Sequence, residues 1–250
     1  MKLVCINDWF NEKSAVLTNY DGFLKALEVL RERDGWDTVF VKKHDYEWEY
    51  KHEAIDIKFT QNPKEMALEM KPDALLFFCD FSRPLLGEFE ESKIPIAMCL
   101  TGGLFDHYVD VPDIVFVESS SYIDAFKGKV KKIERAFGTN TEIFRPIKQP
   151  KVWDAFFPAT FATWKRHNLF AEAMGPRGLA AGYWQPHEPR CYEVCFENGC
   201  GVLHHQGAES MSLLYNQSKT CVIPSASNGG SQRSVLEAMA SNTPPDRDWL

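Results

Sequence analysis

The stretch CVIPSASNGGSQRSVLEAMA, residues 221–240, decides the fold class of this chain. It begins with an apolar run that ends at Pro224, as a buried strand does, and it closes with apolar residues at helical spacing. A loop of small polar residues, which includes the adjacent glycines Gly229 and Gly230, separates the two parts. A strand, a short loop and a helix in this order form the repeating unit of α/β proteins with parallel sheets.

The same alternation extends along most of the chain. Apolar runs such as KLVCI (2–6) and DALLFFC (73–79) alternate with amphipathic segments such as YDGFLKALEVLRERDG (20–35), whose last glycine suits a helix C-cap. The runs are apolar nearly throughout, as expected for parallel strands that helices cover on both faces. Residues 44–60 are charged and aromatic, and their pattern predicts no particular element.

The alternation pauses at FGTNTEIFRPIKQPK (137–151), where prolines among polar residues suit a linker. We therefore predict two doubly wound, Rossmann-like α/β domains with parallel sheets, an N-terminal one over 1–147 and a C-terminal one over 148–250. Ligands of such sheets bind beyond the carboxyl ends of the strands. The two domains are therefore expected to face a cleft.

The composition argues against several classes of partner. The net charge is −7 and no lysine or arginine run is present, so nucleic acid is not expected to bind. No window approaches the roughly 18 apolar residues of a membrane span, and the start of the chain does not resemble a signal peptide. A peripheral membrane contact stays open. The cysteines number seven, and several lie in apolar runs, which predicts reduced thiols and a cytoplasmic location.

The loop before the last helix is a candidate phosphate site. Free N–H groups at a helix N-terminus and the helix dipole favour an anion, and Gly229 and Gly230 allow close approach of the backbone to an oxygen. Hydroxyl and amide partners come from Ser225, Ser227, Asn228 and Ser231. The alternative is an ordinary glycine-containing turn with an N-cap serine.

Glu237 lies in the helix behind this loop, among apolar residues that indicate its packing face. A carboxylate beside such a face needs a partner, because an unpaired buried charge is unfavourable. A pair of sugar hydroxyls is suitable, since an ionised carboxylate accepts two hydrogen bonds. A phosphate at the loop and a ribose at Glu237 together describe a nucleotide. The alternative is a solvated helix residue.

Three segments resemble those of one enzyme family. LLYNQSKTCVIPSASNGGSQRSVLEAMASNTPP (213–245) resembles the donor-binding signature of group 1 glycosyltransferases, which have two Rossmann-like domains in the GT-B fold. FGTNTEIFRP (137–146) is similar to the family's segment that leads from the first domain into the second. FATWKRHNLFAEAM (161–174) looks like the family's phosphate-side lysine motif and its helix.

The resemblance implies roles for particular residues. The family uses two glutamates separated by seven residues; Glu237 matches the second, which binds the ribose, whereas the first falls on Gly229. The family's arginine falls on Thr160, which leaves Lys165 to stabilise the diphosphate as a catalytic residue. Arg233, next to the loop, adds a second positive charge.

The first domain is expected to contribute the loop LTGGLFDHYVD (100–110). It follows a predicted strand, at the place where such enzymes have a histidine or a small polar loop. Gly102 and Gly103 are the candidate binding residues, and His107 is the candidate catalytic residue. The alternative for His107 is an ordinary surface histidine.

The implied function is transfer of a sugar from a nucleoside-diphosphate sugar to a hydroxyl acceptor, with retention, without metal and without a further cofactor. One alternative is a non-catalytic nucleotide-binding protein with the same fold, and another is a sugar-phosphate enzyme such as an epimerase or phosphorylase. The second domain is expected to be incomplete, and its exposed sheet edge favours a homodimer. A zinc site is not expected, because the spacing of Cys191, Cys195, Cys200, His204 and His205 is not standard.

Overall fold

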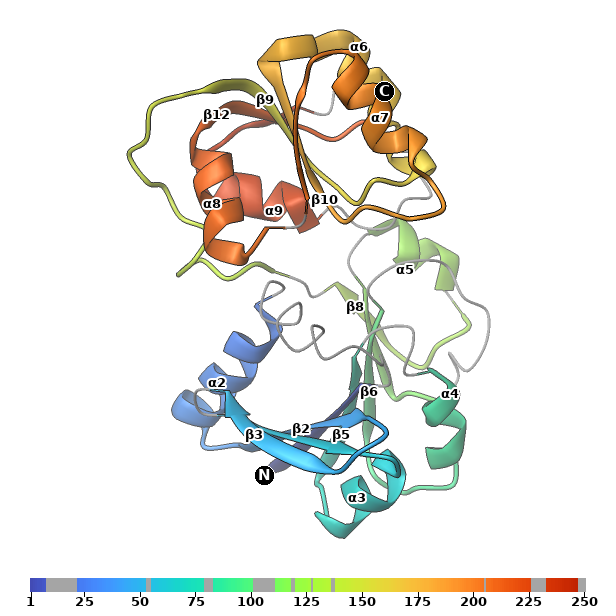
Figure 1. Cartoon of the computed structure of the whole chain (residues 1–250). Coiled ribbons are helices and arrows are strands. Elements are labelled where there is room, and N and C mark those ends of the chain that lie inside the picture. Colours follow the sequence, from blue (N-terminus) through green and yellow to red (C-terminus); the bar gives the residue numbers. More distant parts are fainter. Residues whose placement is uncertain are drawn as a thin grey trace. The chain divides into compact units, whose positions relative to one another are not determined.

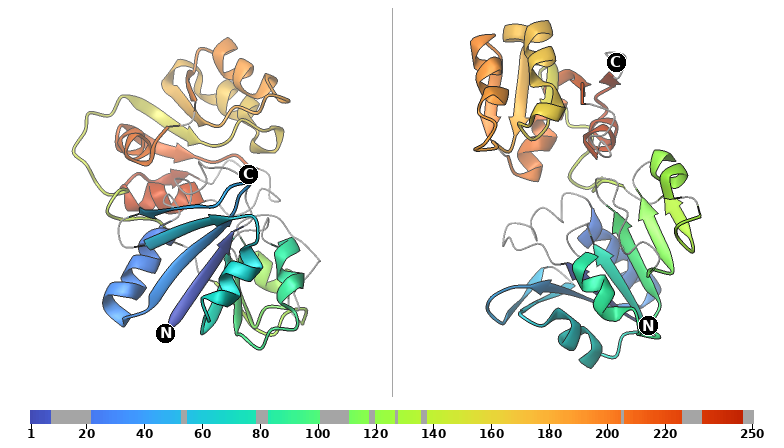
Figure 2. Two further views of the ribbon diagram at one scale, coloured as in Figure 1. Left: turned by 60° about the horizontal axis from the view of Figure 1, so that its bottom comes forward. Right: turned by 90° about the vertical axis from the view of Figure 1, so that its right-hand side faces the viewer.

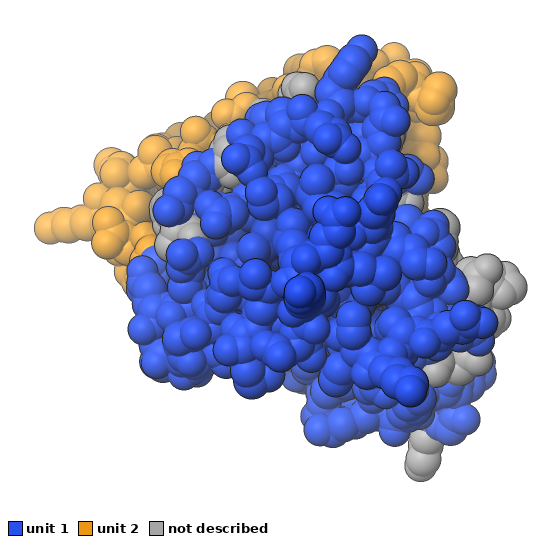
Figure 3. Space-filling view, turned by 90° about the horizontal axis from the view of Figure 1, so that it is seen from below, with its two compact units in different colours: residues 1–137 blue, residues 138–250 orange. Residues whose placement is uncertain are grey.

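The computed structural model describes residues 1–7, 22–52, 55–78, 83–100, 111–117, 120–126, 128–135, 138–204, 206–225 and 233–246. The chain divides into two compact units, Met1–Phe137 (unit 1) and Gly138–Leu250 (unit 2), which are coloured separately in Figure 3. The boundary predicted at 147/148 lies within unit 2. In the described parts of the chain, every helix is too short or too polar to cross a membrane.

Unit 1 is built on an eight-stranded sheet with the order β3-β4-β2-β1-β5-β6-β7-β8 (Figure 1). Its strands are β1 (Lys2–Asn7), β2 (Asp37–Lys43), β3 (Trp48–His52), β4 (Ile55–Thr60), β5 (Ala74–Phe78), β6 (Ile96–Leu100), β7 (Ile114–Val117) and β8 (Ile133–Arg135). All neighbouring strands are parallel except β3 and β4, which are antiparallel. Residues 44–60, for which the sequence pattern predicts no element, therefore contain both strands of the antiparallel pair at the edge, β3 and β4.

The helices of unit 1 cover both faces of this sheet. Their bounds are α2 (Phe23–Asp34), α3 (Pro63–Glu69), α4 (Arg83–Leu86) and α5 (Ser120–Phe126), with a 3-10 turn η2 (Gly87–Phe89) after α4. Alternate residues of β1 pack on opposite sides: Val4 lies in one core with α3, α4 and α5, and Cys5 lies in the other with α2. The predicted C-cap of α2 is confirmed, since Gly35 has a left-handed φ of 68°.

Unit 2 contains a five-stranded parallel sheet with the order β11-β10-β9-β12-β13 (Figure 2). The strands are β9 (Trp153–Pro158), β10 (Gly178–Gly182), β11 (Gly201–His204), β12 (Ser218–Val222) and β13 (Pro245–Asp246). The helices are α6 (His167–Met174), α7 (Arg190–Glu197), α8 (Ala208–Asn216) and α9 (Arg233–Ala240), and the 3-10 turns are η3 (Thr163–Lys165) and η4 (Gly175–Arg177). Figure 1 shows α6 and α7 on one side of the sheet, with α8 and α9 on the other. The predicted doubly wound α/β architecture is therefore confirmed.

The beginning of the predicted linker packs against unit 2. Ser212 Oγ in α8 donates a hydrogen bond of 2.7 Å to the carbonyl of Ile143. Asn216 Nδ2 donates to the carbonyl of Arg145 at 2.9 Å, and its Oδ1 accepts from the N–H of Ile147 at 2.7 Å. Phe144 is fully buried between these bonds. Residues 138–147 therefore belong to unit 2, because side chains of α8 satisfy their backbone.

Candidate functional site

The order of the strands in unit 2 creates a topological switch point between β9 and β12. From β9 the chain proceeds to β10 and β11 on one side, and it then crosses to β12 and β13 on the other. β9 and β12 are parallel neighbours, with Phe156 opposite Cys221, so the segments that follow them begin at the same edge of the sheet. Ligands of open α/β sheets bind at such a point. The lysine motif follows β9 and the motif of Glu237 follows β12, so both segments start at this edge of the sheet.

The segment after β9 is tightly packed before it reaches Lys165. A Cβ atom on Gly182 would lie 1.8 Å from the carbonyl oxygen of Ala159, so only glycine allows this approach of the two backbones. The Lys165 N–H then donates to the carbonyl of Ala162 at 2.9 Å. Lys165 Nζ lies 4.0 Å from the ring centroid of Trp164. Lys165 is therefore half-buried and lies in the segment that follows the carboxyl end of β9.

His167, at the start of α6, is a buried residue that sequence reasoning did not identify. Its ring lies between Phe157 and Phe161, with centroid separations of 4.6 Å and 4.5 Å. The pKa of His167 is lowered to about 4, mainly by burial and to a smaller extent by the nearby charge of Lys165, while the Ala162 carbonyl opposes both effects. The imidazole is therefore neutral at pH 7 and does not add to the positive charge of Lys165.

Ser225 lies just beyond β12 and is 5% exposed. Its Oγ is buried and has no hydrogen-bond partner among the residues that the structure describes. A buried hydroxyl without a partner is unfavourable, so such a group commonly marks a place where a ligand or water binds. The serine lies three residues beyond the end of β12, in the segment that starts at the same sheet edge as the segment of Lys165.

Glu237 is a buried carboxylate with a defined partner. It is 6% exposed, and its Oε2 accepts a hydrogen bond of 2.7 Å from the hydroxyl of Tyr215, which is completely buried. Burial raises the pKa of Glu237, whereas the charge of Arg233 and the bond from Tyr215 lower it. The protein itself thus supplies one hydrogen-bond partner for the Glu237 carboxylate. That partner, Tyr215, lies within the motif 213–245, but the sequence alone does not indicate this role for it.

The remaining predicted residues divide into two groups. Arg233 begins α9 and acts electrostatically on Glu237, so the structure brings these two together. The other predicted binding and catalytic residues lie outside the described residues: Gly102, Gly103, His107, Ser227, Asn228, Gly229, Gly230 and Ser231. In unit 1 the buried Asn7 donates from Nδ2 to the carbonyl of Phe78 at 3.0 Å, which joins the carboxyl ends of β1 and β5.

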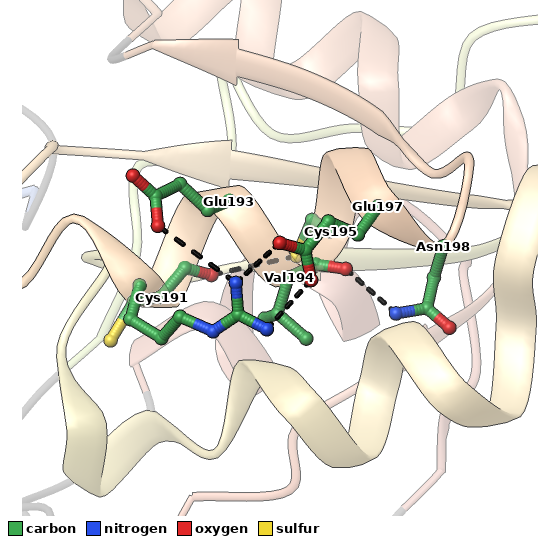
Figure 4. Close-up of polar contacts among 7 residues, drawn as sticks. Cys191, Glu193, Val194, Cys195, Glu197 and Asn198 are labelled. Atoms are coloured by element: carbon green, nitrogen blue, oxygen red, sulfur yellow. Dashed lines mark hydrogen bonds and ion pairs between the residues drawn. The ribbon is translucent and has the colours of Figure 1, made fainter.

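The cysteines of α7 belong to the hydrophobic core. Cys191, Cys195 and Cys200 are buried and free, and they pack with residues of α6 and β9. Figure 4 shows Cys191 and Cys195 on α7 together with Glu193 and Glu197, the two acids that form ion pairs with Arg190. Within the described ranges no group of three or more histidine, cysteine, aspartate or glutamate side chains is arranged to hold a metal ion.

A hollow of about 360 Å³ lies beside α6 and the end of β12. It is lined by Leu169, Phe170, Glu172, Ala173, Met174, Val222 and Pro224. The lining is mostly apolar and its one charged group is an acid, so it is not suited to a diphosphate.

Comparisons with known proteins show which solved structures have a similar fold. No family model matches the chain, and no curated protein matches it. Among solved structures, sucrose-phosphate synthase from Thermosynechococcus elongatus matches with a TM-score of 0.71 and 14% identity, over 98% of this chain and 80% of that one. The chain has the GT-B fold.

Two further GT-B structures match over both units. HepE from Anabaena, in complex with UDP, has a TM-score of 0.65 and 12% identity, over 98% of this chain and 80% of its own. The catalytic domain of starch synthase IV from Arabidopsis thaliana, bound to ADP and acarbose, has a TM-score of 0.68 and 13% identity, over 98% of this chain and 82% of its own. The predicted fold is therefore confirmed over 98% of the chain.

Proposed function

We propose that the protein is a glycosyltransferase that moves a sugar from a nucleoside-diphosphate sugar to a hydroxyl group of an acceptor, with retention and without metal. The observation that carries the proposal is the switch point between β9 and β12, where the segments of Lys165 and Glu237 begin at one sheet edge. Proteins of similar structure that are bound to UDP or ADP support a nucleotide as the ligand.

Each proposed role follows from the charge of the residue. Lys165 and Arg233, with backbone N–H groups at the start of α9, bind the negatively charged diphosphate. Glu237 accepts hydrogen bonds from the ribose hydroxyls in its ionised form. Ser225, whose hydroxyl has no partner among the described residues, supplies a further donor for a phosphate oxygen.

The main catalytic contribution is stabilisation of the leaving diphosphate. Negative charge develops on the diphosphate as the bond to the sugar breaks, and fixed positive charges and dipoles at that place lower the barrier. The acceptor hydroxyl must lose a proton in the same process, and the departing phosphate oxygen or His107 can accept it. In this proposal Gly102 and Gly103 form part of the binding loop of unit 1.

The cellular setting belongs to the proposal as well. The six cysteines that the structure describes are not paired in disulfides, which suits the cytoplasm. A homodimer is proposed through the edge of the unit 2 sheet, where β13 is the outermost strand. The proposal also allows a peripheral contact between a membrane and unit 1, the unit that is proposed to bind the acceptor.

A second candidate function is nucleotide binding without sugar transfer. One sequence feature favours it: Gly229 stands where the resembling family has its first donor-site glutamate. A glycine has no carboxylate to contact the donor sugar. The nucleotide part of the site is unaffected by this difference.

Calorimetric titration with UDP, ADP, GDP and their glucose conjugates tests both candidates, followed by an assay for release of free nucleotide. Glu237→Ala is expected to weaken nucleotide binding by about 1–3 kcal/mol, roughly 5- to 150-fold in Kd, because charge-assisted hydrogen bonds are lost. Glu193→Ala, on the exposed side of α7, is the matched control and should bind as the wild type does. Release of nucleotide from a bound sugar conjugate supports the transferase, and binding without release supports the second candidate. Absence of binding for every nucleotide would refute both.

A further inference from the structure

We infer that Tyr215 is a positioning residue for the proposed nucleotide site: its hydroxyl holds one oxygen of Glu237 in place and leaves the other for the ribose. The inference rests on the proposed function, because it takes Glu237 to be the ribose ligand. It assigns a role to a buried polar group that the sequence motif had left unexplained.

The bond itself joins two helices. Tyr215 lies in α8 and Glu237 lies in α9, and the distance from the hydroxyl to Oε2 is 2.7 Å. This is a short hydrogen bond of the kind that forms between a hydroxyl and a carboxylate. Both side chains are buried, so water cannot readily replace the tyrosine as the partner. Among the described residues, Tyr215 is the hydrogen-bond donor that this carboxylate has.

The tyrosine hydroxyl is itself fixed by its surroundings. The ring contacts Phe156 of β9 edge-to-face, with a centroid separation of 5.1 Å, and Phe144 at 6.0 Å. Thr243, after α9, donates from Oγ1 to the Tyr215 carbonyl at 2.7 Å. Three separate parts of unit 2 therefore determine where the hydroxyl lies. A group held in this way can orient a ligand-binding carboxylate without rearrangement when the ligand binds.

The hydrogen bond from Tyr215 affects the ionisation of the Glu237 carboxyl. Three groups face the carboxyl: the Tyr215 hydroxyl from α8, the Arg233 guanidinium from its own helix, and the buried Cys221 thiol from β12. Burial raises the pKa of Glu237, and Arg233 and Tyr215 oppose that effect. Loss of the tyrosine hydroxyl therefore raises the pKa of Glu237 further. The carboxyl then stays protonated to a higher pH, and a protonated carboxyl is a poorer acceptor for ribose hydroxyls.

A purely structural tyrosine would behave differently, and two variants separate the cases. Tyr215→Phe keeps the ring between Phe144 and Phe156 and removes only the hydroxyl. Thr243→Val removes a buried hydrogen bond of the same length to the backbone of the same tyrosine and leaves the bond to Glu237. Both are expected to lower the thermal midpoint. Only Tyr215→Phe should change nucleotide binding.

The experiment measures the Kd for UDP and ADP between pH 5.5 and 8.5 by calorimetry, for the wild type, Tyr215→Phe, Thr243→Val, Glu237→Gln and the double variant Tyr215→Phe/Glu237→Gln. Ratios to the wild type at each pH cancel the titration of the phosphates. For Tyr215→Phe we expect a Kd about tenfold higher at pH 7, with affinity lost at a higher pH than in the wild type. In the Glu237→Gln background, Tyr215→Phe should have no further effect on the Kd, because it acts through the carboxylate.

The outcomes distinguish this inference from the proposed function. If the wild type binds nucleotide and Tyr215→Phe has the same pH profile as Thr243→Val, Tyr215 has no positioning role and the inference is overturned. An equal effect of Tyr215→Phe with and without Glu237 overturns it as well. If the wild type binds none of UDP, ADP and GDP or their glucose conjugates at any pH, the proposed function fails and the inference fails with it. Should Tyr215→Phe not fold, a pH profile of Glu237→Gln that equals the wild-type profile overturns the inference.

Discussion

Replacement of Asn216 by alanine should detach residues 138–147 from α8. Asn216 is 4% exposed, and its side chain makes three hydrogen bonds, to the Arg145 carbonyl, the Ser212 carbonyl and the Ile147 N–H. Each is worth about 1 kcal/mol net, and the backbone groups that lose a partner are partly rehydrated. We therefore expect Asn216→Ala to lower the free energy of unfolding by about 2–3 kcal/mol, or the thermal midpoint by about 10 °C.

Urea unfolding followed by circular dichroism gives the change in the free energy of unfolding. Tryptic cleavage after the exposed Lys148 should become faster in the variant, because the neighbouring segment is no longer held by α8. Asn198→Ala is the matched control: its amide makes one hydrogen bond of 2.8 Å, to the Val194 carbonyl, and its loss should cost about 1 kcal/mol or less. An Asn216→Ala protein as stable as the control, with unchanged cleavage, would refute this account of the segment.

Two further predictions concern the segment that carries Lys165. The pKa of His167 is about 4 in the fold, below its unfolded value of about 6.5, so the unfolded state binds more protons and stability falls as the pH falls from about 6.5 to 4. His167→Phe should remove up to about 3 kcal/mol of this pH dependence of the free energy of unfolding. Urea unfolding of both proteins at pH 7 and pH 4.5 tests this, and an equal loss of stability in the variant and the wild type would contradict the prediction. Gly182→Ala would bring a Cβ within 1.8 Å of the Ala159 oxygen, so it should displace the segment of Lys165 and weaken UDP binding; calorimetry showing wild-type affinity in a folded Gly182→Ala protein would count against it.

Local sequence pattern was sufficient for the elements of the fold. Nearly continuous apolar runs such as 2–6 and 74–78 become parallel strands whose residues are buried after the first one, because helices cover both faces of the sheet. The strand, loop and helix at 218–240 also placed Glu237 behind a helix start. The need of this carboxylate for a partner followed from its apolar neighbours alone.

The identity of that partner was decided by tertiary structure. Tyr215 and Glu237 are 22 positions apart, and the Asn216 amide reaches a carbonyl 71 positions away. The prolines of 137–151 indicated a linker, yet residues 138–147 pack on α8. Hydrogen bonds from the side chains of Ser212 and Asn216 hold this segment, and its local composition does not reveal them. The pairing of β3 with β4 and the burial of His167 between two phenylalanines were equally absent from the local pattern. Periodicity along a chain reports which face of an element avoids water, whereas the choice of contacts across that face depends on how elements far apart in sequence pack.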